Sequence, residues 1–240
     1  MRRTGVIRMK HNEQAVKRLM RPPSVANWTR HNFRRLDDTR RGLLRFATVP
    51  PIHSLAEVYS ICEAIVTDQI SLDQALKCAI SIAHPVTRKA AIQIIPIFFN
   101  HAQNNSLDGI SAFKGFNTSY PIGRAPDGKT MVIPVSPTFT ILENGLLTPV
   151  FLIAWSTLSL NDYQKQLMST IICNAILTQQ DFSDSDALVI CTPKYKSTEV
   201  RHIRSWKARD YAVLTDDQLQ DQFLRYGTAL ADVMRTLRGE

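Results

Sequence analysis

The segment 138–180 contains the pattern that most restricts the fold of this chain. Asn144-Gly145 lies between two apolar runs, and this dipeptide readily adopts the positive φ angles of a two-residue type I′ hairpin turn. With these two residues as the turn, Phe139 pairs with Val150. The second run, 150–155, is continuously apolar, which is typical of a strand covered on both faces. An amphipathic helical pattern follows, so the segment predicts strand, turn, buried strand and helix.

Helical periodicity occupies the region before this hairpin and the end of the chain. Capping boxes begin several of the predicted helices, because a side-chain oxygen and a residue three positions later can satisfy each other's free backbone amides. The boxes are Ser54 with Glu57, Ser71 with Gln74 and Thr215 with Gln218, and Ser159 is the predicted N-cap of the helix after the hairpin. A period-two pattern predicts a short strand at 130–135, and an apolar run predicts another at 187–192. The turn signal Pro126-Asp127-Gly128 predicts a loop at 120–128.

These patterns predict an α/β fold, with α+β as the alternative. An N-terminal helical layer at 51–105 is followed by a sheet core with a central helix at 113–210. A C-terminal helix occupies 215–238. The mixed sheet has about five strands flanked by helices, and residues 51–240 form a single globular domain.

The charge of the chain is concentrated at its N-terminus. Residues 1–45 hold 13 Lys+Arg and 3 Asp+Glu, whereas the other 195 residues hold 16 and 18. Together with the Pro50-Pro51 boundary, this imbalance predicts a basic, partly flexible arm at 1–50 that meets a polyanion. The predicted nucleic-acid-binding residues are basic side chains for phosphates, with Trp28 for stacking on an exposed base: Arg2, Arg3, Arg8, Lys10, Lys17, Arg18, Arg21, Arg30, Arg34, Arg35, Arg40 and Arg41.

The order strand, tight turn, buried strand, helix and strand resembles the core of the PD-(D/E)XK, or restriction-endonuclease-like, superfamily over about residues 52–195. In that superfamily the first strand begins with Pro-Asp and the second ends in an acidic residue, a spacer and lysine. Here Pro137-Thr138 takes the first position, and Ile153 and Trp155 take the second. The hairpin register puts Ser136 opposite Ile153. The Gln-x-x-x-Tyr motif of some members is absent after Gln164.

The resemblance therefore implies a degenerate nuclease core that binds nucleic acid without cutting it. Two alternatives remain open. In the first, the chain is a protein-interaction or assembly module with no nucleic-acid role, for example as a homo-oligomer. In the second, it is a metal-dependent nuclease whose active site is displaced. The displaced site would use Asp127, Glu143, Asp186 and Lys194.

Cysteine and hydropathy patterns limit cofactor and compartment. The four cysteines, Cys62, Cys78, Cys173 and Cys191, lie apart within apolar segments and have no zinc-ligand spacing. We therefore expect buried thiols in the reducing cytoplasm, with no metal and no other cofactor. No apolar run reaches about 18 residues, so no membrane partner is expected.

Overall fold

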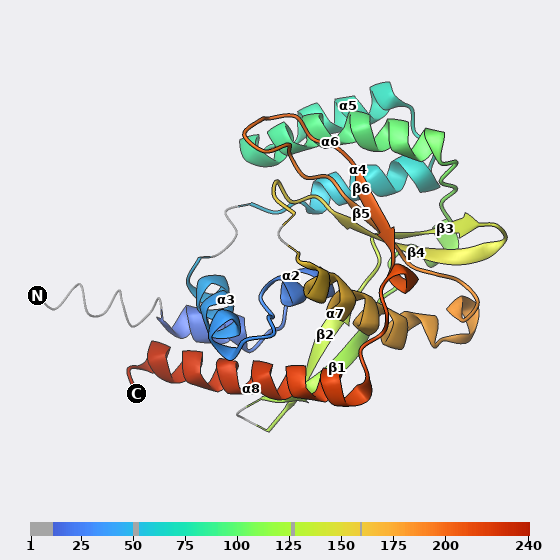
Figure 1. The fold of residues 1–240 in the computed structure, drawn as a ribbon. Coiled ribbons are helices and arrows are strands. Elements are labelled where there is room, and N and C mark those ends of the chain that lie inside the picture. The colour runs from blue at the N-terminus through green and yellow to red at the C-terminus, as the bar shows by residue number, and fades with distance from the viewer. Residues whose placement is uncertain (1–11, 50–52, 126–127, 159) are drawn as a thin grey trace, which may run out of the picture.

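The computed structural model describes residues 12–49, 53–125, 128–158 and 160–240 (Figure 1). Its larger sheet has the order β3-β4-β5-β6, and only the central pair is parallel. These strands are β3 (Phe139–Glu143), β4 (Leu146–Ile153), β5 (Leu188–Cys191) and β6 (Arg204–Lys207). A separate antiparallel hairpin consists of β1 (Thr118–Arg124) and β2 (Thr130–Val135). The α/β class is confirmed, but the sheet has four strands in the described residues, not five, because the predicted strand at 130–135 belongs to the separate hairpin.

The β3–β4 hairpin forms in the predicted register. The Asn144-Gly145 turn residues have φ angles of 52° and 81°, and Phe139 pairs with Val150. The ladder ends at this pair, so the predicted pairing of Ser136 with Ile153 does not form. The turn chemistry is local, and it sets the register as far as the strands continue.

A layer of three helices covers one face of the larger sheet (Figure 1). It consists of α4 (Ala56–Thr67), α5 (Leu72–Ser81) and α6 (Pro85–Asn104). The Ser71 capping box forms as predicted. The Ser54 box does not, because the N-cap of α4 is Leu55 and Ser54 Oγ instead accepts the Ala56 amide. The helical layer shares one core with Val150 and Leu152 of β4.

The opposite face of the sheet packs against α7 (Asp162–Ile172), which continues into a π-helical turn at Cys173–Leu177. Beyond α7 lie the β1–β2 hairpin and α8 (Asp216–Arg238) (Figure 1). Phe151 and Ile153 enter this second core. Successive residues of β4 therefore serve two cores, which confirms that the continuous apolar run is covered on both faces.

Three short 3-10 helices complete the described elements, and side-chain N-caps also form at α7 and α8. The 3-10 turns are Ser111–Phe113, Gln180–Phe182 and Ala208–Asp210. Thr215 caps α8 in the predicted box with Gln218. Asn161 caps α7, whereas the predicted cap Ser159 lies outside the described residues. Among the helices of the described chain, none combines the length and hydrophobicity needed to cross a membrane.

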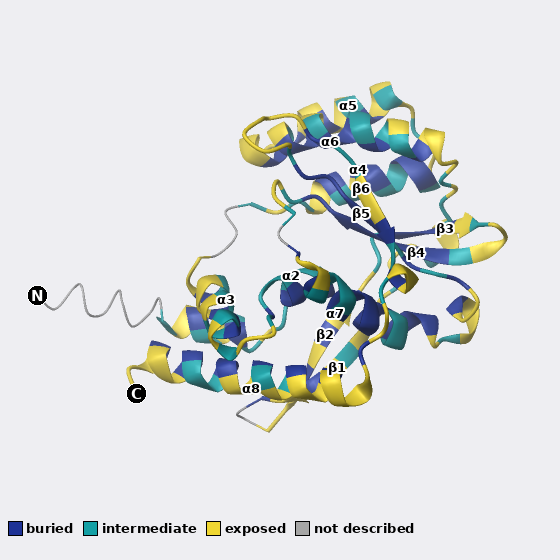
Figure 2. Ribbon diagram, viewed as in Figure 1, coloured by how far each residue is buried: buried dark blue, intermediate teal, exposed yellow. Residues whose placement is uncertain are grey.

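The described part of the predicted N-terminal arm is folded. Residues 12–19 are helical and are followed by α2 (Val25–Arg30) and α3 (Leu36–Thr48). Leu19 and Trp28 are each 1% exposed and belong to the core that contains α7 and α8. Figure 2 shows buried residues in α2. The prediction of an arm at 1–50 is therefore wrong for residues 12–49. Their buried apolar side chains recur at helical spacing, as in Ala15 with Leu19 and Leu43 with Ala47, and they pack in a core shared with elements distant in sequence.

Polar contacts also hold this segment in place. Gln164 of α7 is fully buried, and its Nε2 donates to the carbonyls of Thr29, Arg30 and Asn32 at 3.0–3.1 Å. These carbonyls belong to the end of α2, where helical partners run out. The central helix thus binds the end of α2 directly.

Candidate functional site

The carboxyl ends of β4 and β5 lie at the same edge of the sheet, because these neighbouring strands are parallel. In open α/β sheets, ligands bind in the crevice outside such carboxyl ends. Two depressions lie here. One is a cavity of about 310 Å³ between α2, α4 and the end of β4, called the edge cavity. The other has a volume of about 650 Å³ and lies between the segments that follow β4 and β5; it is called the basic groove.

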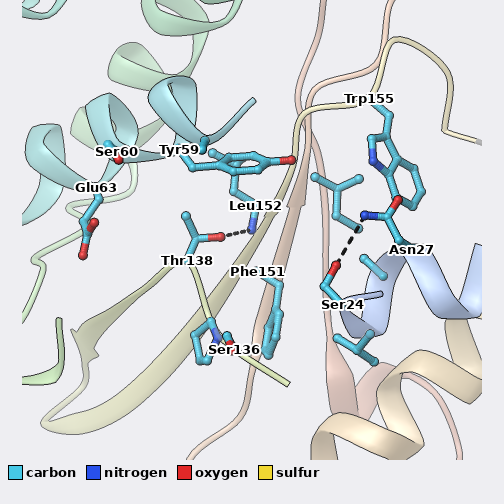
Figure 3. Close-up of a pocket in the computed structure, with 15 residues that line it drawn as sticks. Ser24, Asn27, Tyr59, Ser60, Glu63, Ser136, Thr138, Phe151, Leu152 and Trp155 are labelled. Carbon is cyan, nitrogen blue, oxygen red and sulfur yellow. Dashed lines mark hydrogen bonds between the residues drawn. The ribbon is translucent and has the colours of Figure 1, made fainter. Parts of the chain in front are cut away.

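The edge cavity occupies the position of the expected nuclease site (Figure 3). Thr138 lies on its wall, with its Oγ1 accepting a hydrogen bond from the Leu152 amide at 2.9 Å. Ile153 is 3% exposed, and Trp155 contributes an indole. None of these side chains supplies a carboxylate or an amine. The start of β3 and the end of β4 therefore offer neither carboxylate ligands for a metal nor a lysine that could polarise an attacking water.

Glu63 of α4 is the one carboxylate among the described residues that line the edge cavity. Burial raises the pKa of this carboxyl; Lys114 opposes the rise, and Asp68 adds to it. Magnesium sites need near-octahedral oxygen ligands, and members of the resembled superfamily take carboxylates from the strands. The residues present here do not fit that metal site.

The residues of the predicted displaced site do not converge either. Asp127 lies outside the described residues. Glu143 is bound to Lys207 at 2.9 Å, whereas Asp186, which precedes β5, accepts the backbone amides of Ala187 and Arg209. Lys194 lies beyond the opposite, carboxyl end of β5. Within the described part of the chain, no group of three or more His, Cys, Asp or Glu side chains is placed to hold a metal ion.

The basic groove combines cationic and aromatic side chains. It is lined by Ser156, Thr157, Leu158, Pro193, Lys194, Tyr195, Lys196, Ser197, Thr198, His202 and Arg204. Tyr195 is 53% exposed and stacks on His202 with 4.1 Å between ring centroids. Lys194 is paired with Glu199 at 2.9 Å. Lys196 and Arg204 are exposed, and within the described residues neither forms an ion pair, so their charge is available to an anion.

His202 contributes an aromatic surface and little positive charge. Its Nε2 accepts a hydrogen bond from Arg204 Nε at 3.0 Å, which requires an unprotonated nitrogen. Burial lowers the pKa of this imidazole, and the charge of Arg204 lowers it further. At neutral pH the cations of the groove are therefore Lys194, Lys196 and Arg204.

A buried arginine connects the two segments that form the groove. Arg201 is 7% exposed, and its guanidinium donates to the carbonyls of Ala154 and Trp155 at 3.3 Å and of Thr192 at 2.6 Å. Its Nε also donates to Gln93 of α6 at 3.3 Å. The first two carbonyls follow β4, and the third follows β5. Arg201 therefore holds the carboxyl ends of both strands at a fixed separation.

Glu199 fastens the segment after β5 to the helical layer, and this contact depends on pH. Its Oε2 receives Lys194 and Lys89 at 2.9 Å and Gln93 at 3.3 Å. Lys194, then Lys89 and Gln93, lower the pKa of the carboxyl from 4.5 to about 2. A lowered carboxyl pKa contributes stability that is complete above the unfolded value and is lost as pH falls through the folded value.

We expect the contribution of Glu199 to disappear between about pH 4.5 and about pH 2. Urea unfolding of the wild type and of Glu199→Gln should differ most near neutral pH and converge toward the acid end of this window. A gap that persists unchanged at the lowest pH would contradict the charge-dependent contact. Asp73→Asn on α5, where the carboxylate faces a single lysine, serves as the control.

The basic residues predicted to bind nucleic acid occupy several environments. Arg2, Arg3, Arg8 and Lys10 lie outside the described residues. Lys17, Arg21, Arg34, Arg35 and Arg41 are exposed, and Arg41 pairs with Asp38. Arg18 donates to the Ala47 carbonyl, and Arg40 pairs with Asp37 and Asp232.

Two of these arginines lie on aromatic rings near the carboxyl edge. The guanidinium carbon of Arg30 is 4.7 Å from the centre of the Trp155 ring, and that of Arg34 is 4.9 Å from the centre of Tyr163. Trp155 follows β4, and Tyr163 lies in the first turn of α7. The structure therefore brings Arg30 and Arg34 to the carboxyl edge. It does not do so for Trp28, whose burial excludes the predicted stacking on a base.

The sequence suggested Lys194 for a displaced metal site and Arg204 as an extension of the basic patch, but it did not predict the groove as a site. The motif Lys194-Tyr195-Lys196 indicates only a loop, and Arg204 lies on a strand eight residues farther on. Their meeting depends on the pairing of β5 with β6, which brings Cys191 opposite Arg204. The alternation of lysine and tyrosine at 194–196 was the sequence signal that could have indicated a nucleic-acid-binding site. Comparisons with protein-family models, with curated proteins and with solved structures find no match to this chain.

Proposed function

We propose that this protein binds single-stranded nucleic acid at the carboxyl edge of its sheet and does not cut it. The observation that carries the proposal is the basic groove, where unpaired cations flank an exposed tyrosine. Lys196 and Arg204 suit the phosphates, because neutralising them releases condensed counterions. Tyr195 suits stacking on a base, which requires an unpaired strand.

The non-catalytic part of the proposal rests on the edge cavity. Its one carboxylate and its lack of lysine among the described lining residues do not support metal-dependent cleavage. Arg30 and Arg34, held on aromatic rings, extend the positive charge toward α2 and α7. The four cysteines are free, but only Cys62 and Cys191 are buried as expected, whereas Cys173 is half-buried and Cys78 is exposed. Free thiols favour a reducing compartment, and we place the protein in the cytoplasm.

A salt series with a charge-deficient variant tests the proposal. Fluorescence anisotropy would follow labelled single-stranded DNA and RNA oligomers of mixed sequence. The logarithm of the association constant falls with the logarithm of salt concentration by about 0.7 per neutralised phosphate on a single strand. Replacing Lys196 and Arg204 together by alanine should reduce this slope by about 1.4 and weaken binding about 25-fold near 0.1 M salt.

Lys77→Ala provides the matched control, because Lys77 is an exposed lysine on α5 in the outer helical layer. It should leave both the slope and the affinity unchanged. Oligomer binding that is equally weakened by Lys77→Ala would place the contact elsewhere. Absence of binding by the wild type at low salt would refute the proposal.

A further inference from the structure

The edge cavity and the basic groove are neighbours with opposite electrostatic character. Trp155 lines the cavity, and the next two residues, Ser156 and Thr157, line the groove. The groove contains three cations. Of the described residues that line the cavity, none is basic and one, Glu63, is acidic. The groove therefore offers a phosphate more positive charge than the cavity lining does, whereas an uncharged group can enter the cavity.

The lining of the cavity matches a flat, hydrogen-bonding ring system (Figure 3). The ring of Tyr59 and the indole of Trp155 supply aromatic surface. Hydroxyl groups come from both sides, with Ser24 on α2 and Thr138 before β3. Asn27 adds an amide; its nitrogen contacts only the Ser24 hydroxyl, at 3.4 Å, in the described structure. These groups can donate and accept along the edge of a ring that lies between aromatic side chains.

The size of the cavity narrows the choice of ligand. Pockets for small molecules span about 300–1,000 Å³, and the 310 Å³ of the edge cavity lies at the lower end. That space suits a single ring system and not a folded chain. Aromatic walls, mixed donors and acceptors, and a described lining without a cation together describe an uncharged heteroaromatic base.

We infer that the edge cavity receives one unpaired nucleobase of the strand whose phosphates lie in the basic groove. This inference rests on the proposed function. It adds the chemical class of the group that the edge cavity binds. The base leaves the strand beside Trp155 and enters between α2 and α4. The phosphates on either side remain with Lys196 and Arg204.

A side chain that fills the cavity tests the inference. Ala56 and Glu57 are adjacent, exposed residues in the first turn of α4, but only Ala56 lines the cavity. Ala56→Phe should fill it, and Glu57→Phe adds the same ring outside it. The first measurement is an NMR titration with cytidine or adenosine, which carry a base and no phosphate.

Nucleoside at millimolar concentration should shift the side-chain amide of Asn27 and the indole NH of Trp155. Ala56→Phe should abolish these shifts, and Glu57→Phe should retain them. The second measurement is anisotropy with a labelled oligomer of mixed sequence and with an abasic oligomer of equal length. Ala56→Phe and removal of the bases should each weaken binding about tenfold or more, since stacking contributes on this scale for each base.

The outcomes separate the inference from the proposed function. Nucleosides that leave Asn27 and Trp155 unshifted overturn the inference. Oligomer binding that depends on Lys196 and Arg204 but is the same in the two phenylalanine variants also overturns it, while the proposed function stands. Failure of the wild type to bind any oligomer overturns both.

Discussion

Replacing Trp28 by alanine is expected to lower the free energy of unfolding by roughly 3–5 kcal/mol, the usual cost of removing a buried tryptophan. Trp28 is 1% exposed, and its ring packs against two aromatic residues of α8. The centroids of Phe223 and Tyr226 lie at 6.1 Å and 5.3 Å. The truncation leaves a cavity between α2 and α8, which the surrounding helices cannot fill completely. Urea unfolding followed by circular dichroism measures the change.

Tyr195→Ala is the matched aromatic control for this prediction. Tyr195 is exposed in the basic groove, so its loss should change stability by less than about 0.5 kcal/mol and should weaken oligomer binding. Trp28→Ala should show the reverse at temperatures where it remains folded. If Trp28→Ala instead left stability intact and reduced binding, the predicted arm with Trp28 as a stacking platform would be correct.

The same packing limits which N-terminal truncations can test the binding role of the basic residues. A chain lacking residues 1–45 also lacks Leu19 and Trp28, so it should fail to fold and cannot report on binding. A chain that begins at residue 12 keeps every described residue.

Arg201→Met is expected to cost roughly 3 kcal/mol or more, because each of the three carbonyls that lose their donor costs about 1–3 kcal/mol. Methionine matches the length of the arginine stem but offers no hydrogen to the carbonyls of Ala154, Trp155 and Thr192. The segments after β4 and β5 would then lose their common donor. Oligomer binding should fall as well, since those segments form the basic groove.

Arg204→Met is the matched control for Arg201→Met, because it removes a groove cation without removing a buried hydrogen-bond donor. Arg204 is exposed, lies three residues farther along the chain and lines the groove. Its replacement should change the urea midpoint little while it weakens oligomer binding. Equal urea midpoints for the wild type and Arg201→Met would show that the three carbonyls find other partners and that Arg201 does not hold the edge.

The parts of the fold that were predicted from the sequence depend on local chemistry. The register of β3 and β4 follows from Asn144-Gly145, whose positive φ angles suit a two-residue turn. Helix starts at Ser71 and Thr215 follow from side chains that bond amides three residues away. Each interaction spans fewer than about five residues, so the sequence pattern contains all the information that it needs.

Most of strand β1 was expected to belong to a loop at 120–128 that ends in the turn signal Pro126-Asp127-Gly128, and it also contains Pro121 and Gly123. Proline removes a ladder donor, and glycine favours turns, so both residues argue against a central strand. In the structure, β1 pairs with only one other strand, and the register shifts between these two residues. An edge strand with a bulge accommodates both residues, and an edge position follows from the topology of the sheet, which the local sequence does not determine.

The N-terminal packing and the basic groove depend on contacts between distant residues. Trp28 lies among basic residues, and its burial results from α8, about 195 positions later. Likewise Lys196 and Arg204 meet at one depression only because β5 pairs with β6. Charge composition correctly located the excess of basic residues, but it could not indicate which of them face solvent at a common site.

Photocrosslinking tests the central claim most directly. A single-stranded oligomer that contains 5-bromouracil would be irradiated with the wild-type protein, and the attached residues would be identified by mass spectrometry. Binding in the basic groove predicts attachment at Tyr195, and the base in the edge cavity predicts attachment at Trp155. Attachment confined to the outer helical layer, at Phe99 of α6 for example, would contradict the account.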